Sequence, residues 1–266
     1  MKTRIGILTF HKALNYGAAL QAFALVHHLS TIGYQAEIID FNPGKHAANT
    51  ALFVKPRGLG TAKKDVLNFL NLNYLKRRKQ CFSAFQECHF HLSQERNVTV
   101  SNLGEVAAKY DAVICGSDQI WNPRLAEADL GFFLPEESGF KRITYAASLG
   151  NGYLSEHKHP DQVRKALLHF DAISVREQTT KERLLRFCQI NKSVEIVVDP
   201  TLLLSSEQFL SIAGKRQIQD KFIFLYSVKA RENTIRAAKA LSEKTDRKST
   251  RLNSSHIATS RMPSSA

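Results

Sequence analysis

The chain begins with a strand, a loop, a helix and a second strand, and this unit constrains the fold more than any other feature of the sequence. Residues 5–10 form a short apolar run followed by a polar loop, which is typical of a strand buried on both faces. Between residues 18 and 32, apolar side chains recur every three or four positions and so share one face of a helix. Gly33 ends that helix, and residues 36–41 supply the next strand. The sequence therefore predicts a parallel βαβ unit with a right-handed crossover.

The same alternation continues along most of the chain. Apolar runs and helical patterns follow one another, with a long loop after the opening unit. The predicted strands are 111–118, 142–148, 171–177 and 194–200, the predicted loop is 42–57, and the predicted helices are 62–91, 101–110, 162–170 and 178–187. Strands that alternate with helices favour the α/β class, here a Rossmann-like, doubly wound and mainly parallel sheet.

A second domain is predicted to begin after this series. Residues 1–204 form the N-terminal domain, and residues 205–245 contain a linker helix followed by one strand and one helix. Residues 246–266 are rich in Ser, Thr and Arg, have no usable period and resemble translated adapter sequence. We expect this tail to be disordered and non-native, and the second domain to be truncated.

Composition and charge exclude several classes of protein. No stretch approaches the roughly 18 to 20 apolar residues of a membrane span, and the N-terminus leads directly into a strand, so we expect a cytoplasmic protein. The four cysteines form no C-x-x-C pair, and no histidine pair has companion ligands, so we expect no disulfide, metal or cofactor.

The formal net charge of +13 is unevenly distributed. Between Lys45 and Lys79 there are nine basic residues and a single acid, Asp65. This segment lacks the aromatic and basic pattern of nucleic-acid recognition, so we expect no nucleic-acid partner. It is either a solvated face or a surface that approaches an anionic membrane.

Polar residues follow the predicted strands at the edge where α/β proteins bind ligands. In the first loop, Gly17 permits close approach of a ligand, while Asn15 and Tyr16 offer hydrogen bonds and a stacking face. The alternative is that Asn15 only caps the following helix. His11, in the same loop, is a weak candidate for an acid or base.

The segment GSDQIWNP follows the third strand of the series. Gly116 and Ser117 are small residues at the strand end, Asp118 is a candidate catalytic acid or base, and Trp121 is a candidate platform for a sugar ring. The alternative is a capping aspartate and a tryptophan packed in the core.

The next two strand ends carry further candidate substrate-binding residues. Tyr145 and Ser148 follow one strand, and Arg176 and Glu177 follow the other. A guanidinium can bind a carboxylate or phosphate through two hydrogen bonds, although Arg176 can instead pair with Glu177. We interpret Asp199, at the last strand end, as a strand terminator.

Taken together, five motifs in this order resemble the polysaccharide pyruvyl transferase family: GILTFHKALNYGAALQAFAL, VICGSDQIWNP, YAASLG, FDAISVRE and VVDPTLLL. The resemblance covers about residues 4–230. It implies two Rossmann-like halves similar to GT-B glycosyltransferases, with the active site between them. It also implies transfer of pyruvate from phosphoenolpyruvate to a sugar, commonly as a ketal on two hydroxyls, in a cell-envelope or exported polysaccharide. The acceptor can be lipid-linked.

Two other functions fit the same residues. A GT-B-like glycosyltransferase that uses a nucleotide-sugar has a similar architecture, and fold resemblance does not separate it from a pyruvyl transferase. A chain that lacks half of its cleft can also bind a ligand without turnover.

Overall fold

A computed structural model describes residues 2–43, 72–135, 139–189, 192–216, 218–227, 232–245 and 248–253. The chain divides into two compact units, Met1–Ser205 and Ser206–Ala266. Among the described residues, no helix is both long and apolar enough to cross a membrane.

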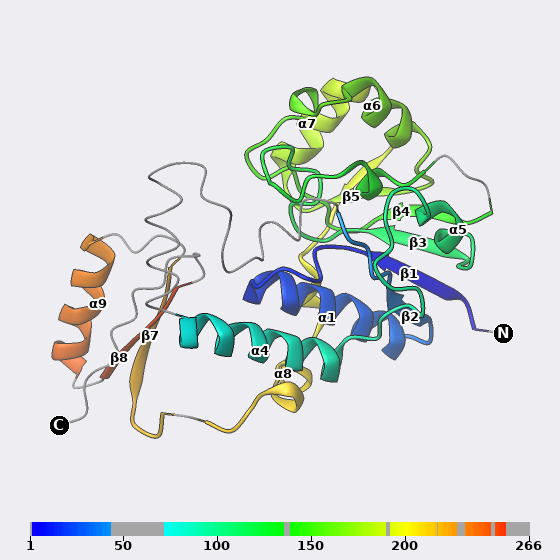
Figure 1. Ribbon diagram of the computed structural model, residues 1–266. Coiled ribbons are helices and arrows are strands. Elements are labelled where there is room, and N and C mark those ends of the chain that lie inside the picture. Colours follow the sequence, from blue (N-terminus) through cyan, green and yellow to red (C-terminus); the bar gives the residue numbers. More distant parts are fainter. Residues whose placement is uncertain are drawn as a thin grey trace. The chain divides into compact units, whose positions relative to one another are not determined.

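The first unit is built on a parallel sheet (Figure 1). Four strands lie in the order β2-β1-β3-β4, and a further parallel pair, β5-β6, continues from β4 through the bridges Ile143–Ala172 and Ala147–Val175. The strands are β1 (Arg4–Leu8), β2 (Gln35–Ile38), β3 (Ala112–Cys115), β4 (Lys141–Thr144), β5 (Ile173–Val175) and β6 (Val194–Ile196). The strand order reverses between β1 and β3, which makes their carboxyl ends the switch point where such sheets bind ligands.

Helices lie on both sides of this sheet. Figure 1 shows α1 on one side and α6 and α7 on the other. The helices are α1 (Tyr16–Thr31), α4 (Leu72–His89), α5 (Leu103–Ala107), α6 (Pro160–Leu168) and α7 (Gln178–Cys188), with short 3₁₀ helices η1 (Leu130–Phe133), η2 (Leu154–Glu156) and η3 (Pro200–Leu203). The predicted parallel α/β class is therefore confirmed for this unit.

The alternation of side chains along β1 explains the two layers of the core. Ile5 and Ile7 point to one face, and Leu8 points to the other, where it joins a cluster with residues of α5, α6 and α7. All three side chains are buried, so β1 is apolar on both faces, as expected for a central parallel strand.

The ends of α1 follow its sequence signals. The side chain of Asn15 accepts a hydrogen bond from Ala18 N at 3.1 Å and so caps the helix. Gly33, just beyond the helix, has φ of +104°, a conformation that glycine adopts without steric cost.

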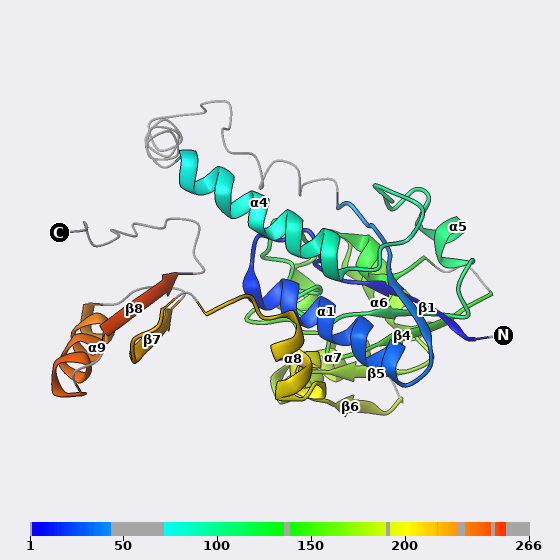
Figure 2. The ribbon, with the colours of Figure 1, turned by 90° about the horizontal axis from the view of Figure 1, so that it is seen from below.

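The helix α4 packs along α1 in both views (Figures 1 and 2). Phe23 of α1 is in edge contact with Phe85 of α4, and Tyr16 lies 5.0 Å from Phe82 between ring centroids. Of the predicted helix 62–91 only the part from Leu72 is described, and of the predicted loop 42–57 only residues 42 and 43 are described.

The second unit contains α8 (Ser206–Ile212), β7 (Phe222–Ser227), α9 (Glu232–Thr245) and β8 (Lys248–Asn253). The strands β7 and β8 pair in parallel through all six residues. The structure differs here from the sequence prediction, which assigned disorder to residues 246–266. Backbone hydrogen bonds to β7 hold β8, and such pairing does not require an apolar period in the sequence. Residues 254–266 lie outside the described part of the chain.

Candidate functional site

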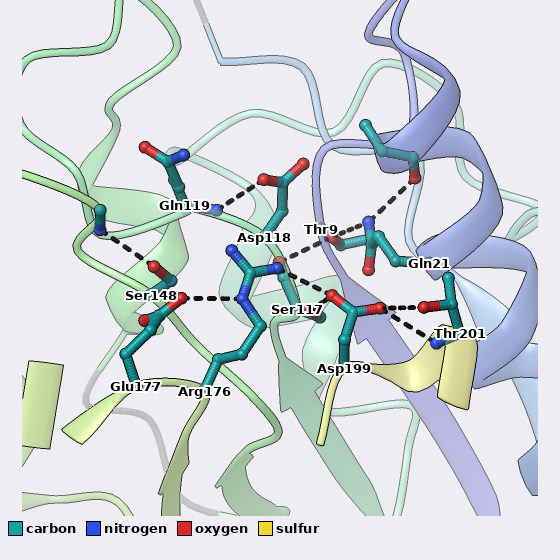
Figure 3. A network of polar contacts seen from close by, with 12 residues as sticks. Thr9, Gln21, Ser117, Asp118, Gln119, Ser148, Arg176, Glu177, Asp199 and Thr201 are labelled. Atoms are coloured by element: carbon teal, nitrogen blue, oxygen red, sulfur yellow. Dashed lines mark hydrogen bonds and ion pairs between the residues drawn. The ribbon is translucent and has the colours of Figure 1, made fainter. Parts of the chain in front are cut away.

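Polar side chains from three strand ends meet at the carboxyl edge of the sheet (Figure 3). Asp118 follows β3, Arg176 and Glu177 follow β5, and Asp199 follows β6. We call these four residues the strand-end cluster. Since the carboxyl end of β1 lies beside that of β3, the strand-end cluster lies at the switch point of the sheet.

Arg176 lies between two carboxylates. Its Nε donates to Glu177 Oε1 at 2.8 Å, and its Nη1 donates to Asp199 Oδ2 at 2.8 Å. Burial alone would lower the pKa of Arg176, but the hydrogen bonds to Glu177 and Asp199 outweigh it, so the pKa is raised. Arg176 thus remains charged, and Nη2 makes no hydrogen bond within the described residues. The pairing with Glu177 that the sequence left open is therefore present.

Asp199 is held in a fixed orientation. Its Oδ1 accepts hydrogen bonds from Thr201 N at 3.0 Å and Thr201 Oγ1 at 2.8 Å, and Ser117 Oγ lies 3.4 Å from Oδ2. Burial raises the pKa of Asp199, but the hydrogen bonds from Thr201 and Arg176 prevail and lower it. Asp199 is thus an ionised carboxylate at neutral pH.

Asp118 has the opposite electrostatic environment. Burial is the main cause that raises its pKa, with a further contribution from Asp199 and only partial compensation by Arg176. Its Oδ1 accepts a hydrogen bond from Gln119 N at 2.8 Å, and it has no ion-pair partner among the described residues. Its φ of +74° is unusual for aspartate. The strand-end cluster therefore combines a carboxyl that readily keeps its proton with one that readily loses it, an arrangement suited to proton transfer.

Gly116 is required by a close approach of two strand ends. Its φ is +123°, and a side-chain Cβ there would overlap the carbonyl oxygen of Tyr145. The peptide bond that follows, between Gly116 and Ser117, is cis. Burial, followed by the negative charge of Asp199, raises the pKa of the Tyr145 hydroxyl.

Ser117 and Ser148 are buried beside the cluster. Ser148 Oγ accepts a hydrogen bond from Gly150 N at 2.9 Å, and Ser148 N donates to the carbonyl oxygen of Asp118 at 3.1 Å. These serines are fully buried, so they shape the loops around the cluster and do not offer free hydroxyls.

Trp121 requires a correction. The sequence suggested a platform for a sugar ring, but the side chain is fully buried and stacks on Phe133 at 5.8 Å between ring centroids. Its Nε1 donates to the carbonyl oxygen of Phe132 at 3.2 Å. The apolar surroundings of η1 draw Trp121 into the core, as in the alternative interpretation.

His11 is also not part of the strand-end cluster, although the sequence suggested it as a weak candidate for an acid or base. Its Nε2 lies 3.0 Å from Asp40 Oδ1 and its Nδ1 lies 3.2 Å from the carbonyl oxygen of Thr9. Lys12 Nζ is 2.8 Å from the same oxygen of Asp40. With both ring nitrogens engaged and the side chain buried, His11 belongs to a structural network and not to the strand-end cluster.

The remaining candidates from the first loop lie at the start of α1. Asn15 caps the helix, and Gly17 occupies its first turn. Tyr16 lines a pocket of about 360 Å³ between α1 and α4, together with Arg77, Arg78 and apolar residues. In the part of the chain that the structure describes, neither Asn15 nor Gly17 makes a hydrogen bond to the strand-end cluster.

Sequence reasoning missed one member of the strand-end cluster and two residues beside it. Asp199 was interpreted only as a strand terminator, although it follows the same strand-end rule as Asp118 and Arg176. Thr9 and Gln21 gave no signal, because a threonine at a strand end and a glutamine within a helix are common in every class of protein. Across the described part of the chain, no group of three or more His, Cys, Asp or Glu side chains is arranged to hold a metal ion.

The fold and the strand-end cluster define an α/β protein with two aspartates of opposite pKa shift and an arginine at the carboxyl edge of a parallel sheet. The comparison with protein families is more specific. The family model for polysaccharide pyruvyl transferase matches residues 15–261, nearly the whole chain. The protein therefore belongs to the polysaccharide pyruvyl transferase family and is a transferase. A search against curated proteins finds no significant match.

Proposed function

We propose that this protein transfers pyruvate from phosphoenolpyruvate to a pair of sugar hydroxyls and forms a ketal, in cell-envelope or exopolysaccharide synthesis. The observation that supports this proposal most directly is the meeting of Asp118, Arg176 and Asp199 at the switch point, in a chain of this family. The reaction requires proton transfer to carbon and from oxygen, next to a carboxylate that must be held.

Asp118 is the proposed proton carrier. Its protonated carboxyl gives a proton to C3 of the enol, a sugar hydroxyl attacks C2, and the proton of that hydroxyl returns to Asp118. Phosphate then leaves from C2, and the second hydroxyl attacks the same carbon while its proton goes to the departing phosphate. The products are the ketal and inorganic phosphate, and Asp118 ends protonated as it began.

Arg176 and Asp199 have the complementary roles. The free Nη2 edge of Arg176 is placed to hold the carboxylate of the pyruvyl group, and Asp199 fixes the guanidinium and accepts hydrogen bonds from sugar hydroxyls. Glu177 and Asp199 together outweigh the charge of Arg176. This excess of negative charge repels a phosphate dianion more strongly than a singly charged carboxylate, so we assign the pyruvyl carboxylate and the hydroxyls, and not the phosphate, to the strand-end cluster.

The test is release of phosphate from phosphoenolpyruvate in the presence of a panel of saccharides, with detection of the ketal by mass. The variant Asp118→Asn should lower kcat by about 100-fold or more, because the amide carries no transferable proton. The variant Arg176→Lys should mainly raise KM for phosphoenolpyruvate, because lysine lacks the planar fork. Arg124→Lys is the matched control, since Arg124 forms a similar pair with Glu156 away from the cluster.

Unchanged kcat in Asp118→Asn would remove the proposed proton carrier. A UDP-sugar that raises Tm and is consumed, while phosphoenolpyruvate does neither, would favour a glycosyltransferase instead.

We also propose that the second unit opens a second Rossmann-like domain of a GT-B-like architecture, in which residues 1–204 are the first domain. Its strand β7 followed by the helix α9 is the kind of βα unit with which such a domain begins. Sequencing the source DNA beyond the codon for Thr245 tests this proposal. Continued alternation of strands and helices supports it, and a stop codon or an unrelated frame contradicts it.

The exposed cations of α4 support a peripheral contact with an anionic membrane surface, where a lipid-linked acceptor would be found. Lys76, Arg77 and Lys79 are exposed, whereas Arg78 is buried and donates to the carbonyl oxygen of Leu14 at 2.5 Å. Neutralising the three exposed cations to Gln should abolish salt-sensitive binding to phosphatidylglycerol vesicles. A control variant with Lys158, Arg186 and Lys221 changed to Gln loses the same charge elsewhere, and equal loss of binding in both variants would contradict the assignment to α4.

A further inference from the structure

A chain of buried hydrogen bonds connects α1 to the loop that carries Asp118 (Figure 3). Gln21 Nε2 donates to Thr9 Oγ1 at 2.9 Å, and Thr9 Oγ1 donates to the carbonyl oxygen of Ser117 at 3.2 Å. Gln21 and Thr9 are each 2% exposed, and Ser117 is fully buried. The residue directly after this carbonyl is Asp118.

The direction of each bond in this chain is determined by its neighbours. Gln21 Nε2 also lies 3.0 Å from the carbonyl oxygen of Ala18, which can only accept. The side-chain amide of Gln21 must therefore point its nitrogen, and not its oxygen, toward Ala18 and Thr9. In the flipped orientation, Gln21 Oε1 would face the carbonyl oxygen of Ala18, and two acceptors would be in contact. Because Thr9 Oγ1 accepts from Gln21, its own proton is available to the carbonyl oxygen of Ser117.

The other half of the Gln21 amide makes no bond. Gln21 Oε1 is buried and has no hydrogen-bond partner among the described residues. A buried acceptor without a donor is unfavourable for stability. An apolar side chain of similar length would avoid this loss of stability. We therefore attribute the role of Gln21 to its Nε2 group, which donates to Thr9.

We propose that Gln21 and Thr9 are positioning residues for the transferase reaction, which act by holding the Ser117 carbonyl and thereby the carboxyl of Asp118. Asp118 has φ of +74°, and its own carbonyl oxygen accepts from Ser148 N at 3.1 Å, so both peptide oxygens of this turn are anchored by neighbouring elements. This inference rests on the role proposed above for Asp118 as proton carrier.

The test compares Thr9→Val, Thr9→Ser and Gln21→Met. Thr9→Val removes the hydroxyl at nearly constant shape, and we expect kcat to fall by about 10- to 100-fold with little change in KM, because the proton carrier and not the binding group is misplaced. Gln21→Met should lower kcat in the same way. Thr9→Ser keeps the hydroxyl and should restore kcat.

Thr144→Val is the matched control. Thr144 is equally buried, and its hydroxyl donates to the carbonyl oxygen of Ser174 at 2.8 Å, in the same kind of bond between neighbouring strand ends but with no link to Ser117. Thr144→Val should therefore lower Tm without lowering the kcat of the folded protein. Equal losses of kcat in Thr9→Val and Thr144→Val, or no rescue by Thr9→Ser, would overturn the inference.

A second readout does not need turnover. The carboxyl of Asp118 can be followed by ¹³C NMR as pH is varied, with Asp118→Asn to assign its signal. Since burial is what raises the pKa of Asp118, a loosened turn admits water, and the titration midpoint should move down in Thr9→Val but not in Thr144→Val. An unmoved midpoint in Thr9→Val refutes the positioning role. A moved midpoint in a protein that does not consume phosphoenolpyruvate refutes the proposed function alone.

Discussion

Replacing Gly116 by alanine tests the close approach of the two strand ends that shapes the site. The new Cβ would overlap the carbonyl oxygen of Tyr145 and lie 3.2 Å from its carbonyl carbon. Backbone atoms cannot turn aside as a flexible side chain can, so the loop between β3 and Asp118 must move.

The loss of stability in Gly116→Ala has two causes, backbone strain and steric overlap, and a second glycine separates them. Gly139 has φ of +115°, close to the +123° of Gly116, but within the described part of the chain an alanine Cβ there would meet nothing within 4 Å. Gly139→Ala therefore measures the backbone strain alone, about 1–3 kcal/mol. Gly116→Ala adds the overlap with Tyr145, which costs about a further 1–3 kcal/mol. The difference corresponds to about 2–12 °C in Tm for a chain of this size.

Urea unfolding of both variants and the parent, followed by circular dichroism, measures these free energies. Activity of the folded protein should fall in Gly116→Ala and stay unchanged in Gly139→Ala, because only the first displaces Asp118. Equal stabilities of the two variants would show that the strand ends do not approach each other as the structure has them.

Three further predictions follow from single side chains. Trp121→Ala should lower the free energy of unfolding by about 3–5 kcal/mol in the same urea assay, because it removes a fully buried ring. A small loss of stability together with weaker saccharide binding would instead support a role of Trp121 in stacking on a sugar. The pKa of Asp118 is raised, as a proton-donating carboxyl requires, so kcat should decline as pH rises through that pKa. The variant Asp118→Asn should lack this decline. The same pH profile in the variant and the parent would argue against Asp118 as the acid. Burial raises the pKa of Asp40, but hydrogen bonds from His11 and Lys12 prevail and hold the pKa far below its ordinary value of 3.8. The ionised carboxylate therefore stabilises the fold above pH 3.8, and this stabilisation is lost as pH falls through the depressed pKa. Asp40→Asn should accordingly lower the urea midpoint at neutral pH more than in strong acid, and an equal loss at both would contradict the charged network.

The strand ends show how far the sequence alone can predict a site. The rule that polar residues after parallel strands gather at one edge correctly placed Asp118, Arg176 and Glu177. It did not predict what each residue would contact. The sequence left open whether Arg176 binds an anion or pairs with Glu177. The structure shows the pair with Glu177 and adds a second carboxylate, Asp199, from the next strand end.

Local patterns determined the alternation of β-strands and helices, because a period of two or of 3.6 residues is set by the backbone itself. They also predicted the parallel direction of the strands, and they offered the helix cap at Asn15 as one of two possible roles for that residue. These features require only neighbouring residues, so they can be recognised in one sequence.

Only the tertiary structure decided which polar groups meet and which side chains are buried. Ser117 and Asp199 are 82 positions apart, and Thr9 and Ser117 are 108 positions apart, yet both pairs are in contact at the switch point. Trp121 stacks in the core and His11 pairs with Asp40, because burial and the nearest charge, and not residue type, decide what a side chain does. The free energies that select these partners arise from packing the whole sheet, so they cannot be recognised from the spacing of apolar residues along one segment.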